Sequence, residues 1–238
     1  MQDNYVGDIG DYGKYGLLRE VCATGLSLAV NWYKVVPQKI GKQDDGKYIQ
    51  YLLKPTLYRD YDSELFDALH TIVCDRQDRR LKCIEQANLF PAKFYSQVIG
   101  KDREHWHWDA LDKTLGVNVV FLDPDNGLET VNMRRMGTAT EKHAKWTEIK
   151  DYYSRGQNVI LYQHRPQMTS KEKCIESVMC FQKEYLSADC VKVLEFPKYT
   201  NRFYFMFLHK DKEKSFNKVC SEMTRKWGHN GFCCEVNL

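Results

Sequence analysis

Two apolar runs of the sequence, residues 117–122 and 158–162, each end in a group of polar side chains that could do chemistry. Asp123, Asp125 and Asn126 follow the first run, and Gln163, His164 and Arg165 follow the second. In open α/β sheets, ligands bind at the carboxyl ends of the strands. If the two runs form neighbouring strands, a carboxylate, an amide and an imidazole meet in one crevice. The candidate catalytic residues are therefore Asp123, Asp125, Asn126 and His164.

The segment 123–127 also has a purely structural interpretation, because Asp, Asn, Pro and Gly are turn formers. Turn formation explains one or two of these polar residues, but it explains less well why Glu129 follows them. Carboxylates are the side chains that hold Mg²⁺ in proteins. The candidate ligands of a Mg²⁺ or Mn²⁺ ion are Asp123, Asp125 and Glu129. For His164 and Arg165, a helix-capping or surface role is the structural alternative.

A second cluster lies near the N-terminus, where Asp8, Asp11 and Lys14 are interspersed with glycines and tyrosines. In the structural interpretation, Asp8 or Asp11 caps a helix, and Asp11 forms an i,i+3 ion pair with Lys14. In the functional interpretation, the start of the helix binds a phosphate or another ligand, with Lys14 as a donor and the glycines giving access to the backbone. The glycine spacing matches neither the Walker motif nor G-x-G-x-x-G.

Hydrophobic periodicity indicates the elements that position these residues. A helix is predicted at residues 12–24, in which Gly13 and Gly16 permit a close approach of a neighbouring element or a ligand. A β-like run follows at residues 28–36, and the polar segment 38–47 is expected to be a surface loop. Further apolar runs predict strands at residues 117–122, 158–162, 191–196 and 202–208, with amphipathic helices between most of them.

Apolar strands that alternate with amphipathic helices are typical of a parallel α/β sheet. The runs 191–196 and 202–208 are too close in the sequence for a helical crossover, so this pair is predicted to be antiparallel. The sequence therefore predicts one Rossmann-like, doubly wound α/β domain over residues 1–238. Its sheet is expected to be mostly parallel with an antiparallel C-terminal strand pair, and a helical insertion is expected at about residues 77–115.

The composition excludes several classes of protein. With 238 residues, 43% hydrophobic residues and a net charge of +3, the chain is too apolar and too balanced for a disordered protein. The sequence lacks an apolar run of ~18 residues, so we expect no membrane-spanning helix. The polar first residues are unlike a signal peptide, and nine cysteines without a C-x-x-C motif are typical of reduced thiols. We therefore expect a cytoplasmic location.

The small net charge excludes only a protein that is basic throughout. Acidic residues gather at positions 8–11 and 123–129, whereas residues 134–145 form a basic stretch. The net charge can therefore average an acidic crevice with a basic rim, and any binding of nucleic acid is expected to be local.

Three motifs carry a resemblance to known proteins. They are G-D-x-x-D-Y-x-K-Y-x-L-L-R at residues 7–19, F-L-D-P-D-N-G-L-E at residues 121–129 and Y-Q-H-R-P at residues 162–166. Together they resemble an uncharacterised family of bacterial and mobile-element proteins over most of the chain. More distantly, the layout is similar to that of the ribosomal RNA adenine-N6 methyltransferases, which place a D-P-P-Y tetrapeptide after a central strand.

The second resemblance implies S-adenosylmethionine as cofactor and a nucleic acid or nucleotide as substrate. Asp123 would accept a hydrogen bond from the target amino group. The implied cofactor-binding residues are Asp8, Asp11, Lys14, Asn31 and Trp32. The sequence departs from the methyltransferase pattern at two places. Asp125 and Asn126 replace the second proline and the aromatic residue of the tetrapeptide, and residues 31–33 replace the glycine-rich cofactor loop.

These observations leave three functions open. The first is an S-adenosylmethionine-dependent methyltransferase that acts on nucleic acid or a nucleotide. The second is a metal-dependent nuclease or phosphohydrolase that uses Asp123, Asp125 and Glu129. The third is a non-catalytic module that binds a nucleotide or a partner protein. Charged side chains at strand ends are costly unless they are used, which favours an enzyme.

Overall fold

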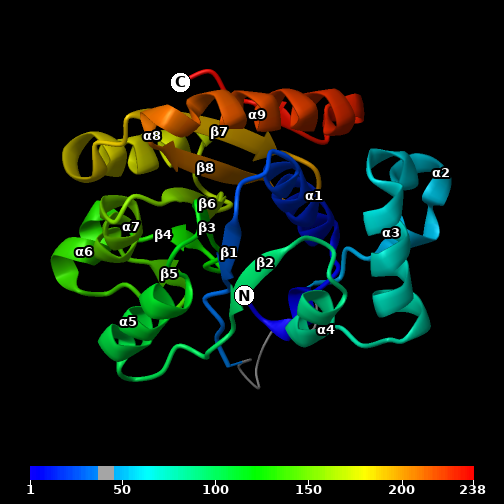
Figure 1. Ribbon diagram of the computed structural model, residues 1–238, viewed down its shortest axis with the longest axis horizontal. Helices are drawn as coiled ribbons and strands as arrows, with labels where there is room; N and C mark the ends of the chain where they lie inside the picture. The colour runs from blue at the N-terminus through cyan, green and yellow to red at the C-terminus, as the bar shows by residue number, and fades with distance from the viewer. Residues whose placement is uncertain (37–45) are drawn as a thin grey trace.

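The computed structural model describes residues 1–36 and 46–238. Within these residues the chain forms a seven-stranded sheet with the order β2-β1-β3-β6-β8-β7-β9, and a two-stranded sheet of β4 and β5 (Figure 1). The strands are β1 Leu28–Asn31, β2 Ala92–Tyr95, β3 Val119–Leu122, β4 Gly127–Leu128, β5 His143–Ala144, β6 Asn158–His164, β7 Cys190–Phe196, β8 Arg202–Leu208 and β9 Cys234–Glu235. The α-helices are α1 Ile9–Ala23, α2 Pro55–Tyr58, α3 Ser63–His70, α4 Leu81–Gln86, α5 Arg103–Lys113, α6 Val131–Met136, α7 Trp146–Ser154, α8 Lys171–Phe181 and α9 Glu213–Trp227.

The directions of the strands confirm the predicted fold class. Strands β2, β1, β3 and β6 are parallel neighbours, whereas β8 runs antiparallel to both β6 and β7. Strand β9 adds an antiparallel edge beyond β7. The protein is therefore a Rossmann-like α/β fold whose mostly parallel sheet ends in antiparallel C-terminal strands.

Helices cover both faces of the large sheet. Because successive side chains of a strand point to opposite faces, Val119 and Phe121 of β3 join the core beneath α1, α3, α4 and α9. Val120 and Leu122 join the second core, beneath α5, α7 and α8. A strand that is buried on both faces has to be apolar throughout, which explains the unbroken apolar run of β3.

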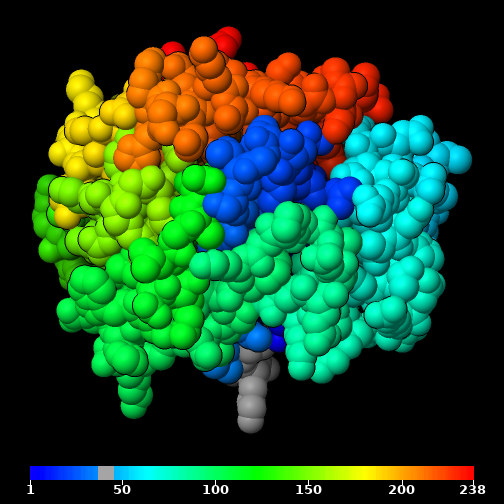
Figure 2. Space-filling model, in the orientation of Figure 1, coloured from blue at the N-terminus to red at the C-terminus, as the bar shows by residue number. Residues whose placement is uncertain are grey.

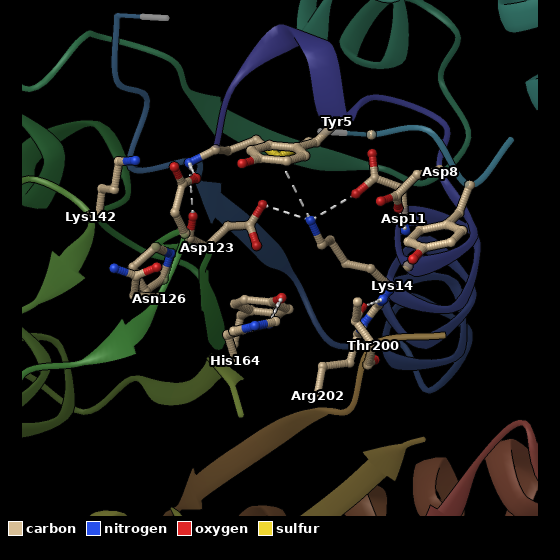
Figure 3. A pocket seen from close by; sticks show the side chains of 17 residues that line it. Tyr5, Asp8, Asp11, Lys14, Asp123, Asn126, Lys142, His164, Thr200 and Arg202 are labelled. Carbon is tan, nitrogen blue, oxygen red and sulfur yellow. Dashed lines mark hydrogen bonds and ion pairs between the residues drawn. The ribbon is translucent and has the colours of Figure 1, made fainter. Parts of the chain in front are cut away.

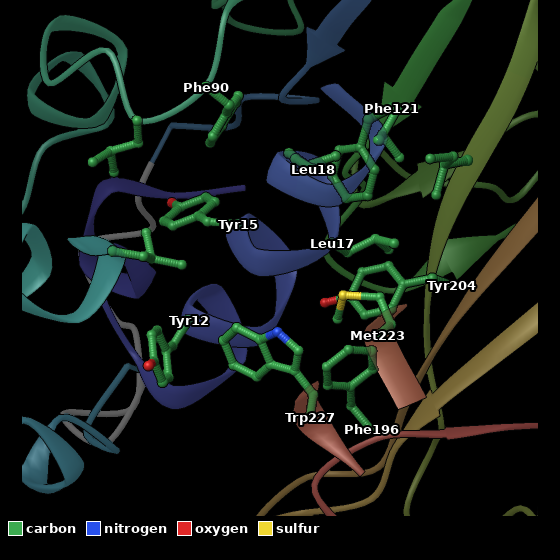
Figure 4. Close-up of a cluster of buried hydrophobic side chains, with 14 of the residues drawn as sticks. Tyr12, Tyr15, Leu17, Leu18, Phe90, Phe121, Phe196, Tyr204, Met223 and Trp227 are labelled. Carbon is green, nitrogen blue, oxygen red and sulfur yellow. The ribbon is translucent and has the colours of Figure 1, made fainter. Parts of the chain in front are cut away.

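The glycines of α1 allow this helix to lie close to the C-terminal elements, as the sequence predicted. A Cβ atom at Gly13 would lie 2.6 Å from the ring of Phe196, and one at Gly16 would lie 2.3 Å from the ring of Trp227. Figure 4 shows the indole of Trp227 beside Tyr12, and the two ring centroids are 4.7 Å apart. This packing fixes α1 against the sheet and so fixes the polar cluster at its N-terminal end.

Helix α1 is enclosed by neighbouring elements on more than one side. In Figure 2 the helix (blue) lies between α9 (orange to red) and the segment that carries α4 and β2 (green). The buried residues of α1 include Asp11 and Lys14. Buried charges are costly unless they are paired and hydrogen-bonded, so these two side chains need partners inside the fold.

Two local differences separate the structure from the sequence-based expectation. The segment 77–115 contains α4 and α5 but also the edge strand β2, which was not predicted. Only Tyr95 of β2 is fully buried, so neither a helical nor an alternating apolar pattern marks this strand. Strand β1 ends at Asn31 instead of residue 36. Most of the predicted loop at residues 38–47 lies outside the described residues.

Within the described ranges, no helix is long and apolar enough to cross a membrane.

Candidate functional site

A cavity of about 300 Å³ opens at the carboxyl edge of the parallel strands (Figure 3). Its walls come from the N-terminal segment and the start of α1, the loop after β3, the end of β6, and the turn between β7 and β8. The lining residues are Met1, Tyr5, Asp8, Gly10, Asp11, Lys14, Gly46, Tyr48, Asp123, Pro124, Asp125, Asn126, Lys142, Tyr162, His164, Thr200 and Arg202. The cavity thus combines the two polar clusters that the sequence indicated separately.

Strand topology brings the two clusters together. Strands β3 and β6 are parallel neighbours, so the loops after Leu122 and the residues at the end of β6 leave the sheet at the same edge. In the antiparallel strand β8 the chain enters the sheet at this edge, and Arg202, its first residue, pairs with His164. The N-terminal end of α1 lies at the same edge and completes the site.

Lys14 is the centre of the charge network in the cavity. Its Nζ atom donates to Asp11 Oδ1 at 2.9 Å and to Asp123 Oδ2 at 2.8 Å. The ammonium also lies 5.6 Å from the centre of the Tyr162 ring. The second oxygen of Asp11 accepts from the Tyr15 hydroxyl at 2.8 Å and from the Gly7 amide at 3.0 Å. The predicted i,i+3 ion pair of Asp11 and Lys14 is confirmed, and Asp123 adds a contact that sequence proximity could not reveal.

The protonation of this network follows from burial and from the neighbouring charges. Burial raises the pKa of the Asp123 carboxyl, and the ammonium of Lys14 lowers it in part. Burial alone would lower the pKa of Lys14, but Asp11 and Asp123 hold it well above its ordinary value. Lys14 is therefore charged at neutral pH, and its charge opposes the protonation of Asp123.

Asp8 caps α1 and connects the helix to Arg202. Asp8 Oδ1 accepts from the Asp11 amide at 2.9 Å, which confirms the predicted cap. Burial and the nearby Asp11 raise the pKa of the Asp8 carboxyl, whereas Arg202 lowers it. The guanidinium of Arg202 packs over Gly10, where a Cβ atom would overlap it, and donates to the carbonyl oxygen of Thr200 at 3.2 Å. The absence of a side chain at Gly10 is therefore what lets Arg202 reach the start of α1.

Gly127 and Gln163 hold the loop that carries Asp123 and Asn126. Gly127 has a φ of +98°, which favours glycine, and a Cβ there would lie 2.3 Å from Gln163 Oε1. That oxygen accepts from the Leu128 amide at 2.8 Å, and the Gln163 amide group donates to the Asn126 carbonyl at 3.3 Å. Through these hydrogen bonds, Gln163 fixes the conformation of the loop.

The side chains of this loop have further contacts. Asp125 Oδ1 lies 2.7 Å from the amino nitrogen of Met1, and its Oδ2 accepts from Gln2 at 3.0 Å. The Asn126 amide nitrogen lies 3.4 Å from His143 Nε2. Asp125 is therefore committed to the N-terminal segment, whereas Asn126 lies at the wall of the cavity in Figure 3.

The imidazole of His164 lines the cavity from the end of β6. Its Nδ1 atom lies 3.5 Å from the hydroxyl of Tyr162. Burial, followed by the positive charges of Arg202 and Arg165, lowers the pKa of His164. The imidazole is therefore neutral at pH 7. Burial raises the pKa of Tyr162 to about 12, so that hydroxyl keeps its proton.

Three of the predicted site residues do not line the cavity. The Asn31 amide donates to the Tyr152 hydroxyl at 3.1 Å, and the Trp32 indole donates to Glu85 at 3.0 Å, both from fully buried positions. Glu129 accepts from the Trp146 amide at 2.8 Å.

The three predicted metal ligands, Asp123, Asp125 and Glu129, therefore do not meet at one point. In the part of the chain that the structure describes, no group of three or more His, Cys, Asp or Glu side chains is arranged to hold a metal ion. The ammonium of Lys14 instead lies between Asp11 and Asp123 and neutralises them.

The cavity also contains residues that were not among the predicted site residues. Tyr5, Tyr48, Tyr162, Lys142 and Arg202 all contribute to its lining. A signal for Arg202 was present, since the first residue of an antiparallel strand lies where its parallel neighbours end. In the sequence, Tyr162 belongs to the Y-Q-H-R-P motif and Lys142 belongs to the basic stretch, but neither is predicted to be a site residue. Tyr5 precedes Asp8 in the N-terminal cluster of tyrosines, glycines and acidic residues, whereas Tyr48 carries no sequence signal that would join it to the other residues.

Fold and site together define a class of protein: a Rossmann-like α/β protein with a charged cavity at the carboxyl edge of its parallel strands. This is where open α/β proteins bind their ligands. In comparisons with known proteins, no family model matches the chain, and no curated protein matches it.

Proposed function

We propose that the protein is a methyltransferase that uses S-adenosylmethionine to methylate an exocyclic amino group of a nucleotide base, free or within nucleic acid. One observation carries the proposal. The carboxylate of Asp123, at the carboxyl end of an interior strand, lines the cavity, and Lys14 opposes its protonation. A buried, ionised carboxylate is suited to an amine because it accepts an N–H hydrogen bond and favours positive charge on the nitrogen.

The remaining lining residues suit a nucleotide. The rings of Tyr5, Tyr48 and Tyr162 offer aromatic surface for a base. The cations of Lys142 and Arg202 lie at the same cavity and suit a phosphate group. Asn126 adds an amide that can recognise the edge of a base.

The cavity residues also suit parts of S-adenosylmethionine. Asp8 offers a carboxylate to an ammonium or to ribose hydroxyl groups, because one of its oxygens caps α1 and the other is not hydrogen-bonded within the described residues. Asp11 and Lys14, which the resemblance also assigns to the cofactor, line the same cavity as Asp8. The cofactor supplies a methyl group on a positively charged sulfur when it is bound. Asn31 and Trp32 have no part in this proposal, because their polar atoms bond elsewhere.

The chemistry assigned to the chain is electrostatic. Asp123 accepts a hydrogen bond from the amine and orients it, and its negative charge stabilises the positive charge that develops on the nitrogen during transfer. Lys14 is a positioning residue: its two ion pairs fix the carboxylate and oppose the protonation that burial favours. A protonated Asp123 would be neutral, so it would lose the negative charge that stabilises the transition state.

The test is transfer of a radioactive methyl group from S-adenosylmethionine to DNA, RNA and free nucleotides. We expect transfer by the wild-type protein and a loss of about 10²–10³-fold in Asp123→Asn, the size reported for removal of one electrostatic stabilising group. Asp67→Asn is the matched control, because Asp67 is an exposed carboxylate paired with Arg59 far from the cavity. Addition of EDTA should leave transfer unchanged.

The opposite pattern would support a different function. Absence of methyl transfer to every substrate, with cleavage of nucleic acid that EDTA abolishes, would reject the methyltransferase in favour of the metal-dependent enzyme. Thermal unfolding of each variant shows whether a loss of activity reflects a loss of fold.

A further inference from the structure

The proposed methyl transfer creates a proton that the site has to remove. When an amine nitrogen takes a methyl group, the new N–C bond forms as the C–S bond of the donor breaks, and the electron pair of that bond stays on the sulfur. The nitrogen then carries a positive charge and one proton too many. The cavity needs a group that accepts this proton, and the ammonium of Lys14 opposes the protonation of Asp123.

Few groups at the cavity can accept a proton at neutral pH. Lys14, Lys142 and Arg202 are cations. Asp11 uses both carboxylate oxygens in hydrogen bonds, and Asp125 uses both in contacts with Met1 and Gln2. The hydroxyl of Tyr162 holds its own proton. Besides Asp123, whose protonation the ammonium of Lys14 opposes, two acceptors remain among the described lining residues, namely His164 and Asp8.

The surroundings of His164 keep its imidazole neutral. The charged and titratable groups that face it are Tyr162 on its own strand, Arg165 next in the chain and Arg202 on the neighbouring strand β8. Burial and the two guanidinium groups disfavour the imidazolium ion, so the pKa of His164 lies below its ordinary value. A neutral imidazole accepts a proton and then releases it readily, because the same cations repel the imidazolium.

The position of His164 fits this role. Figure 3 shows the imidazole between the Asp123–Asn126 wall and Arg202. Asp8 lies at the opposite end, at the start of α1, and one of its oxygens is occupied by the helix cap. The imidazole is therefore the acceptor on the side where Asp123 and Asn126 would hold the amine.

We infer that His164 is the general base of the site and takes the proton that the methylated amine releases. The proton moves from the nitrogen of the product to an imidazole nitrogen and then through the cavity mouth to water. The inference rests on the proposed function, since it assigns the proton of that reaction. It makes His164 a catalytic residue and leaves Asp123 as the group that orients the amine.

The experiment combines kinetics with a measurement on the free protein. We expect the pH profile of kcat/KM for the wild type, which reports the free enzyme, to fall on the acid side, with an apparent pKa below ~6.5, the ordinary value for histidine. NMR titration of the His164 ring in the protein without ligand should give the same value. His164→Asn should lose about 10²–10⁴-fold in kcat, the range for general acid–base catalysis, and should lose the acid limb. Added imidazole should restore part of the activity.

Control variants separate the possible failures. Asp8→Asn should keep the acid limb, and a limb that instead disappears in Asp8→Asn and persists in His164→Asn would overturn the inference and assign the proton to Asp8. Methyl transfer by the wild type with an unchanged profile in His164→Asn would reject His164 as the base while leaving the proposed function intact. Absence of transfer by the wild type on all substrates would overturn both.

Discussion

Replacement of Lys14 by methionine tests the charge network on which the site depends. Methionine keeps the length and the apolar stem of the side chain but removes the ammonium. Lys14 pairs with Asp11 at 2.9 Å and with Asp123 at 2.8 Å, and all three side chains are at most 5% exposed. Removal of one partner from a buried ion pair costs about 3–5 kcal/mol, because the remaining charge stays buried without compensation.

The expected change is large enough to measure by thermal and urea unfolding. For a chain of this length, about 3–5 kcal/mol corresponds to a fall of about 6–20 °C in Tm. The matched control is Lys210→Met, which removes the ion pair of an exposed lysine with Glu213 and should cost only about 0–1 kcal/mol. In a double-mutant cycle, Lys14→Met with Asp123→Asn should cost less than the sum of the single changes.

Lys14→Met also changes the titration of the site. Loss of the ammonium removes the main opposition to burial, so the pKa of Asp123 rises further. In Lys14→Met, protonation of Asp123 should therefore add a second loss of methyl transfer on the acid side, separate from the acid limb assigned to His164. The reasoning is refuted if Lys14→Met costs no more stability than Lys210→Met, or if the double variant shows no coupling between Lys14 and Asp123.

The remaining predictions concern packing, a hydroxyl group and pH. Gly16→Ala should cost about 1–3 kcal/mol because its Cβ would lie 2.3 Å from Trp227, whereas Gly100→Ala, which meets nothing within 4 Å, should stay within about 0.5 kcal/mol of wild type in urea unfolding. Tyr15→Phe should cost about 1–3 kcal/mol through the lost bond to Asp11. Tyr204→Phe should cost nothing, because that buried hydroxyl has no hydrogen-bond partner within the described residues; an equal cost for both would contradict this. His143 and His164 have lowered pKa values, so the unfolded chain binds more protons and the free energy of unfolding should fall as pH drops through ~6.5. This loss of stability at low pH should be smaller in the double variant His143→Gln/His164→Gln. An unchanged dependence of the free energy of unfolding on pH would show that these two histidines do not cause it.

The fold could be predicted largely because its strands carry strong local signals. The runs that became β3 and β6 are apolar on both faces, and the short connection between β7 and β8 permits only an antiparallel pair. Strand β2 could not be predicted, because it is a four-residue edge strand with one fully buried residue. Its pairing with β1 depends on a partner that is distant in the sequence.

The site was predictable where residues follow strand ends. Asp123, Asn126 and His164 line the cavity because neighbouring parallel strands end at the same edge. Glu129 follows the same strand end but does not line the cavity, because its carboxylate accepts a hydrogen bond from the Trp146 amide. Asn31 lies at a strand end as well, but its side chain bonds to Tyr152 within the sheet layers. The direction of a side chain at a strand end depends on tertiary packing that the sequence does not display.

The central claim is that Asp123 holds an amine at the carboxyl edge of the sheet. The most direct measurement is a crystal structure of the protein with S-adenosylhomocysteine and adenosine monophosphate. We expect the exocyclic amine of the nucleotide within hydrogen-bonding distance, about 3 Å, of an Asp123 oxygen, with the phosphate toward Arg202 or Lys142. A nucleotide bound outside this cavity, or bound in it with its amine turned away from Asp123, would contradict the account.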